Sequence, residues 1–158
     1  MFSHRYIWAF LFIVFLILEL ANIKSLTLFG TRPDFILILT VFAGLNQGIL
    51  YGASLGFAGG LAKEIFSNAL LGPLAFSLTL SGFIAGLFGQ RVFYQNVFIQ
   101  AIIIFMATLF KMTLTSWLLI FIHHSSYPSR AFISQAFYNA LITPPIYFLL
   151  SNLFSNKR

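Results

Sequence analysis

The sequence has no cysteine, and only 3 of its 158 residues are acidic. Without cysteine the chain can form no disulfide, no reactive thiolate and no cysteine-based metal site, and its redox compartment stays undetermined. The three carboxylates, on Glu19, Asp34 and Glu64, leave general acid–base catalysis almost nothing to use. The sequence also has no Walker loop and no H-E-x-x-H motif, and we expect no nucleophile elbow. It therefore predicts a protein that is not an enzyme and needs no metal or cofactor.

Charge of either sign is scarce as well. Charged residues make up 8% of the chain and hydrophobic residues 59%, and the mean hydropathy is +0.94. A soluble domain carries about 25% charged residues, so this chain cannot cover a surface that faces water. The net charge of +6 comes from scattered single residues rather than from a basic face, which argues against a nucleic-acid partner. Membrane lipid is the expected environment.

Long apolar runs fill the sequence instead. A helix needs roughly 20 apolar residues to cross a bilayer, and six stretches are candidates. They lie at about 6–23, 35–47, 48–66, 70–89, 97–122 and 131–153. The loops between them are too short for an extramembrane domain, and the sequence shows no internal repeat. We therefore predict an all-α integral membrane protein in which residues 1–158 form a single bundle of six transmembrane helices.

Proline residues mark the expected limits and interruptions of these helices. We expect Pro33 to lie in the first turn of the second helix and Pro73 to start the fourth, while Pro144 and Pro145 should interrupt the sixth. The second and third helices are joined by very few residues. They must therefore form an antiparallel hairpin or one broken helix.

Glycine recurs at every fourth position through the third stretch. The stripe comprises Gly44, Gly48, Gly52, Gly56 and Gly60, and the fourth stretch adds Gly82 and Gly86. In lipid, stripes of small residues at this spacing allow two helix backbones to pack closely. Two interpretations stay open. Either the third helix is the crowded centre of the bundle and its neighbours fill the stripe, or the stripe is a groove for a helix of another protein.

A few polar residues lie inside the apolar stretches. Lys111 is near the middle of the fifth, where a charge costs roughly 2.5–3.5 kcal/mol. We expect it to face the interior and pair with Glu64, or failing that with Glu19; a snorkelling or neutral lysine and transport chemistry are the alternatives. Asn139 comes shortly before the double proline, and we expect it to bond the carbonyl groups that the prolines leave free.

Four stretches in a fixed order cover nearly the whole chain and resemble a known family. They are the loop that ends in Arg32-Pro33-Asp34, GLAKEIFSNALLG (60–72), SGFIAGLFGQRVF (81–93) and AFYNALITPPIYFLL (136–150). In order, length and spacing they resemble the bacterial rod shape-determining protein MreD family. Members usually carry Asp where this chain has Glu64, and an apolar residue where it has Lys63.

The resemblance implies a non-catalytic scaffold or regulatory subunit of the inner membrane, in the complex that elongates the cell and builds lateral peptidoglycan. It implies that the chain packs against a transmembrane helix of MreC, with RodA, its class B penicillin-binding transpeptidase and MreB as further partners. By analogy, it also implies a six-helix fold similar to the substrate-binding subunits of energy-coupling-factor transporters.

A different function is a small-solute, vitamin-type binding subunit of such a transporter. This function requires a polar, aromatic-lined cavity, to which Tyr51, Asn68 and Lys111 could contribute polar groups. Basic residues divide equally between the two sides of the membrane, but the side with the termini carries no acid. This asymmetry predicts that both termini are cytoplasmic.

Overall fold

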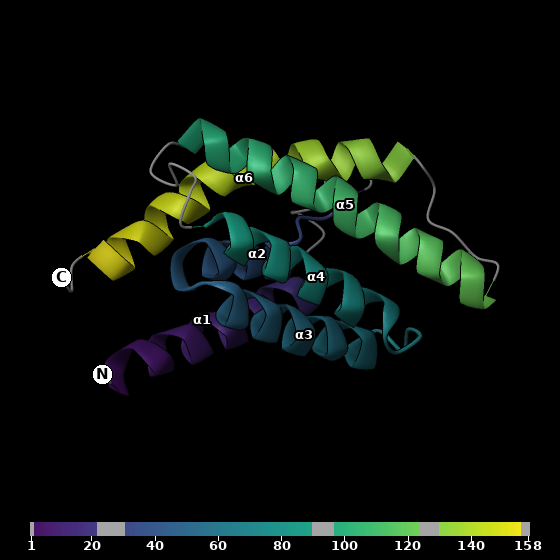
Figure 1. Cartoon of the computed structure of the whole chain (residues 1–158), viewed down its shortest axis with the longest axis horizontal. Helices are drawn as coiled ribbons and strands as arrows, with labels where there is room; N and C mark the ends of the chain where they lie inside the picture. Colours follow the sequence, from purple (N-terminus) through teal and green to yellow (C-terminus); the bar gives the residue numbers. More distant parts are fainter. Residues whose placement is uncertain (1, 22–30, 90–96, 124–129, 156–158) are drawn as a thin grey trace.

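The structure, a computed structural model, describes residues 2–21, 31–89, 97–123 and 130–155, and these ranges form six α-helices (Figure 1). The helices are α1 (Phe2–Leu20), α2 (Phe35–Gln47), α3 (Ile49–Phe66), α4 (Pro73–Phe88), α5 (Val97–His123) and α6 (Arg130–Ser155). Each coincides with a predicted stretch to within a few residues at its ends. The all-helical prediction is confirmed for these ranges.

The helices differ in their capacity to cross a membrane. By length and composition, one helix in the described part of the chain is long and apolar enough, at Phe98–Ile122 within α5. Shorter apolar helices occur at Tyr6–Leu20, Phe35–Gln47 and Pro73–Phe88. With 13 residues, α2 cannot cross the hydrocarbon core alone, because it is about 20 Å long and the core is about 30 Å thick. The helix has the predicted bounds 35–47, and its place in a membrane stays a prediction.

The central helix of the bundle is α2, not α3. Every residue from Phe35 to Leu45 is buried, and α2 lies in the middle of the other helices in Figure 1. Ring centroids of Trp8 and Phe42 lie 5.9 Å apart, and those of Phe42 and Tyr147 lie 5.2 Å apart, so α1 and α6 both pack on α2. The prediction that the third helix is the crowded centre is wrong. A helix that is apolar on all sides is buried all round, whereas α3 exposes one side.

The connection between α2 and α3 is a single residue, Gly48, with φ +92°. A side chain would strain this left-handed backbone. The two helices run antiparallel and lie side by side. A Cβ added at Gly52 would lie 2.8 Å from the Cα of Gly44, near the turn, and one added at Gly59 would meet Ile36, at the far end of α2. Of the two predicted arrangements, the antiparallel hairpin is the one observed.

One of the predicted proline roles is confirmed, and the others are not. Pro73 is the first residue of α4, as predicted. Pro33 lies outside α2, whose N-cap is Asp34. Pro144 and Pro145 lie inside α6, which continues past them to Ser155. Figure 1 shows α6 changing direction part-way along its length, so the two prolines accompany a bend rather than a break in the helix.

Candidate functional site

All three carboxylates of the chain accept hydrogen bonds at the start of a helix. Two of them serve α2. Glu19 Oε2 accepts from the backbone N–H groups of Phe35 and Ile36, at 2.7 and 3.4 Å, and Asp34 Oδ1 accepts from that of Leu37, at 3.1 Å. The first N–H groups of a helix have no partner within it, and its N-terminus favours negative charge. Glu19 and Asp34 together therefore cap the central helix.

The third carboxylate, on Glu64, serves α4 in the same way. Its Oε2 accepts from the backbone N–H of Gly72 at 2.9 Å, and its Oε1 from that of Leu74 at 2.6 Å. Pro73 lies between them and has no N–H to donate. Glu64 is 1% exposed. It holds the end of α3 to the start of α4 and is therefore not the partner of Lys111.

Two lysines neutralise the carboxylates at the start of α2. Lys63 Nζ lies 2.8 Å from Glu19 Oε1 and 3.1 Å from Asp34 Oδ1, and Lys111 Nζ lies 2.7 Å from Asp34 Oδ2. Asp34 is fully buried, and the side chains of the other three are at most 17% exposed. We call these four residues the charge cluster. It joins α1, α3 and α5 at the N-terminus of α2.

The last helix joins the charge cluster through Asn139. Asn139 Oδ1 accepts from the backbone N–H of Asp34 at 2.8 Å, and its Nδ2 donates to Thr108 Oγ1 at 3.1 Å. Gln135 Nε2 donates to the carbonyl of Arg32 at 3.1 Å. The prediction that Asn139 bonds carbonyls freed by the prolines is wrong, because its amide holds the segment before α2 and the middle of α5.

The predicted pairing of Lys111 with Glu64 is also wrong, although Lys111 does face the interior and finds a carboxylate. Its partner, Asp34, is 77 positions away in sequence. In the sequence, Asp34 was noted only as one of the three carboxylates and as the end of the Arg32-Pro33-Asp34 motif. Lys63 was noted only as a basic residue at a position where MreD-family members usually have an apolar one. The sequence feature that could have indicated the cluster is Asp34, which comes directly before the apolar run 35–45.

The charge cluster is arranged for holding helices together. Its two carboxylates and two ammonium groups sum to zero net charge, and each ammonium group bonds at least one carboxylate. Among the residues that the structure describes, no group of three or more histidine, aspartate and glutamate side chains is placed to hold a metal ion. Buried charges that are paired and hydrogen-bonded are typical of a structural network.

A pattern overlooked in the sequence is Gly52-Ala53-Ser54-Leu55-Gly56, which has the letters of a G-x-S-x-G nucleophile elbow. A functional elbow is a sharp turn between a strand and a helix. Here the five residues lie inside α3. The Ser54 hydroxyl is exposed and donates to the carbonyl of Tyr51 at 3.1 Å. The match is therefore a by-product of the glycine stripe.

The glycine stripe of α3 packs against the backbone of α4. A Cβ at Gly52 would collide with the carbonyl oxygen of Gly82, and one at Gly56 with that of Leu78. At Gly60 the neighbour is the backbone of the first turn of α4. Only glycine allows two backbones to come this close. We call this contact the α3–α4 seam. A helix from another protein could enter the stripe only by displacing α4.

The other glycines of the predicted set extend the seam toward α2. A Cβ at Gly44 would lie 2.7 Å from the carbonyl oxygen of Gly82, and one at Gly86 would collide with the backbone of Ile49. Gly48 differs, since a Cβ there would have no heavy atom within 4 Å. Its glycine is required by the positive φ of the turn. The set therefore joins α2, α3 and α4 into one tightly packed unit.

Residues 3–157 match the family described as rod shape-determining protein MreD. The chain belongs to the MreD family. MreD proteins are bacterial membrane proteins with a role in rod-shape determination, and the family is a structural, shape-determining one. No curated protein and no solved structure matches this MreD-family chain. The likeness to subunits of energy-coupling-factor transporters therefore stays a prediction.

Proposed function

We propose that this MreD-family chain is a non-catalytic scaffold or regulatory subunit of the cell-elongation complex in the bacterial inner membrane. Its helices pack against a transmembrane helix of a partner such as MreC. RodA, a class B penicillin-binding transpeptidase and MreB are further members of the assembly, which builds lateral peptidoglycan.

The use of all three carboxylates as helix caps carries this proposal. Glu19 and Asp34 hold the start of α2, and Glu64 holds the start of α4. The chain has no other acidic residue. General acid–base chemistry and proton relay require groups that are free to gain and lose a proton, whereas these three carboxylates are each bonded to helix N–H groups. The carboxylates therefore serve the fold, and the outer faces of the helices are the surface that can pack against a partner.

The outer surface of the bundle is apolar, as helix packing within a membrane requires. Leu50, Phe98 and Phe121 are each about four-fifths exposed, and these side chains can contact lipid or another transmembrane helix. The α3–α4 seam contributes by holding α3 and α4 rigidly together. A partner helix that packs on the outside of this pair then meets a fixed surface.

We further propose that both termini are cytoplasmic. The first turn of α1 and the last turn of α6 lie at the same end of the bundle in Figure 1. Arg5 lies in the first turn of α1, Lys157 and Arg158 follow α6 in the sequence, and no acidic residue lies near either end. Basic residues are retained on the cytoplasmic side of a membrane.

The transporter alternative finds no support in the arrangement of its candidate residues. Tyr51 is in the first turn of α3, and Asn68 follows the end of that helix. They are about 25 Å apart along the helix axis. Lys111 is bonded to Asp34. These three residues therefore do not line one polar cavity.

Co-purification tests the proposal directly. The tagged full-length chain is extracted from its native membranes in mild detergent, and the bound proteins are identified by mass spectrometry. An unrelated membrane protein with the same tag is the control. The scaffold role predicts recovery of an MreC-like protein with cell-wall synthesis enzymes. Recovery of paired ATPases with a coupling membrane subunit instead would contradict it.

A further inference from the structure

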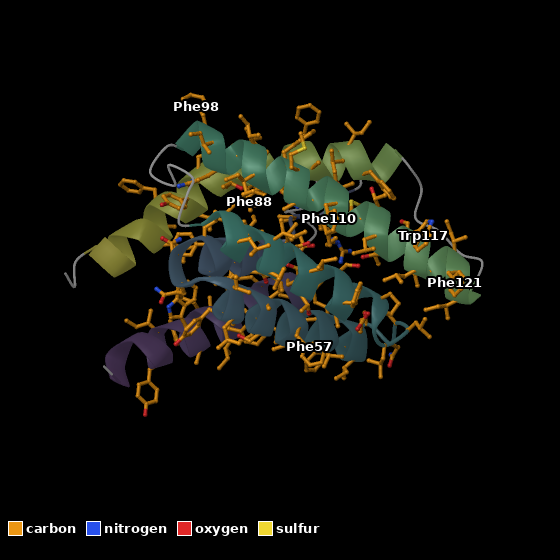
Figure 2. The ribbon with its side chains drawn as sticks, viewed as in Figure 1. Phe57, Phe88, Phe98, Phe110, Trp117 and Phe121 are labelled. Atoms are coloured by element: carbon orange, nitrogen blue, oxygen red, sulfur yellow. The ribbon has the colours of Figure 1, made fainter. Side chains whose placement is uncertain are left out.

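A cavity of about 350 Å³ lies between α4 and α5 and opens at the surface of the bundle. Val41 and Leu45 of α2 contribute to its buried floor. One wall is the α4 segment 81–88, and the other is the α5 segment 102–110. Figure 2 shows Phe88 of α4 and Phe110 of α5 where the two helices face each other.

The lining of this cavity offers nothing to a polar ligand. Of its residues only Ser81 is polar, and the Ser81 hydroxyl donates to the carbonyl of Ser77 at 2.8 Å. The rim is apolar too, with Phe88 56% and Ile102 and Met106 each 60% exposed. Sugars, nucleotides and vitamins need convergent polar groups in their sites. The lining is therefore suited to an apolar group.

The length of the cavity distinguishes between two apolar occupants, a transmembrane helix and a lipid acyl chain. The cavity extends about 12 Å along α5, from Ile102 to Phe110. A transmembrane helix crosses the full hydrocarbon core of about 30 Å and would need a groove of that length. An acyl chain reaches through only one leaflet, which matches the length of this cavity.

The position of the cavity along α5 also fits a lipid chain. The apolar part of α5 runs from Phe98 to Ile122, and the cavity begins near its start and ends near its middle. Half of a bilayer's hydrocarbon core is about 15 Å thick. The cavity therefore covers the depth of one leaflet, over which an acyl chain extends from its headgroup.

We propose that the α4–α5 cavity is a binding site for one acyl chain of a membrane phospholipid. The chain fills the space between the two helices and contacts the floor that α2 provides. An empty space of this size would deprive its lining of van der Waals contacts. This inference goes beyond the scaffold function and does not depend on which protein the chain binds.

Native mass spectrometry of the purified full-length chain tests the proposal, with phosphatidylethanolamine as the probe. Detergent is raised until loosely held lipid is removed. The wild type is expected to retain one phospholipid per chain. Ala107→Phe, which places a ring in the cavity, should retain at least tenfold less. Ala58→Phe, on an exposed part of α3, is the matched control and should retain as much as the wild type.

Several results would overturn the proposal. One is a wild type that retains no phospholipid. Another is equal retention by Ala107→Phe and the wild type when both melt at the same temperature. If Ala107→Phe does not fold, Met106→Trp on the exposed rim replaces it, with the same expectation. The wild type could also purify as a dimer or with another membrane protein. If the cavity variant loses that partner while its lipid retention is unchanged, the cavity binds the partner and not a lipid.

Discussion

At the scale of single residues, the fold depends on very few charges. A buried lysine near the middle of an apolar helix costs roughly 2.5–3.5 kcal/mol in a membrane, and Asp34 offsets this cost for Lys111 at 2.7 Å. Asp34 in turn lies at the start of a buried helix, where unpaired N–H groups would be costly in lipid. One carboxylate thus satisfies a cation and a helix N-terminus at once.

We expect Lys111→Met to destabilise the protein by about 3–5 kcal/mol, because it removes one partner of a buried ion pair. Thermal unfolding in detergent, followed by the loss of the monodisperse peak in size-exclusion chromatography, measures the effect. Thr113→Met, at an exposed position two residues further along α5, is the matched control. Equal melting temperatures for the two variants would show that the pair contributes nothing.

Neutralising both partners should cost much less than neutralising one. Asp34→Asn keeps an oxygen that can accept from the N–H of Leu37, since asparagine is as good an N-cap as aspartate. With Lys111→Met in the same chain, Lys63 and Glu19 still pair and no unpaired charge stays buried. We expect the double variant to recover most of the stability that either single variant loses. A double variant as unstable as the sum of the singles would refute the pairing.

Glu64→Ala should destabilise the protein by about 2 kcal/mol, because the N–H groups of Gly72 and Leu74 lose a charged acceptor. The same unfolding measurement applies. Thr113→Ala is the control, since it also removes a side-chain hydrogen bond to a helix carbonyl, but at an exposed position. A Glu64 effect no larger than that of Thr113 would mean that the cap is not important.

The position of Lys111 in the middle of an apolar stretch was enough to predict that it faces inward and pairs with an acid. This position was not enough to identify the acid. Glu64 and Asp34 both lie near helix ends on the same predicted side of the membrane, and only the packing of α5 beside the start of α2 selects Asp34. The Asn139 contacts likewise depend on how α6 is placed.

At the scale of helices, the glycine stripe acts through α4. Gly56→Ala should already separate α3 from α4, because the added Cβ meets the backbone at Leu78, which cannot move aside as a side chain can. We expect a loss above about 3 kcal/mol, at the level of severe core overpacking, with failure to fold as well as failure to capture a partner. Ala58→Leu, which faces outward on α3, is the control. A well-folded Gly56→Ala protein would contradict the α3–α4 seam.

Gly48→Ala should be milder and should act for a different reason. Its Cβ meets no heavy atom within 4 Å, but its φ of +92° is unfavourable for alanine by about 1–2 kcal/mol. Comparing the melting temperatures of Gly48→Ala and Gly56→Ala separates the two causes. The smaller loss is expected at Gly48, and the reverse order would contradict the assignment.

Six helices and their approximate ends could be predicted from apolar runs and from Gly and Pro, because these features are local. The identity of the central helix could not. Residues 35–45 contain one polar side chain, Thr40, and are therefore apolar on every side, which is the pattern of a buried helix. The glycine stripe drew attention to α3 instead, although small residues mark any close helix contact, central or not.

In the whole molecule, three carboxylates and two lysines hold helices α1–α5 together, and Asn139 joins α6 to them. The described helices of this MreD-family chain expose mainly large apolar side chains. Such a molecule is suited to packing against other membrane components. Under the proposed function, the charge cluster is structural, and partners meet the surfaces which the cluster keeps in place.

Replacing the native chain in the cell with the double variant Asp34→Asn/Lys111→Met tests whether the charge cluster has a purely structural role. Cell shape is scored by microscopy, and co-purification of the elongation proteins is measured in parallel with the folded yield. If the charge cluster is purely structural, the cells stay rod-shaped and the normal set of partners is recovered. A double variant that folds and reaches the membrane in normal amount, but leaves the cells round, would show that these charges serve the function itself.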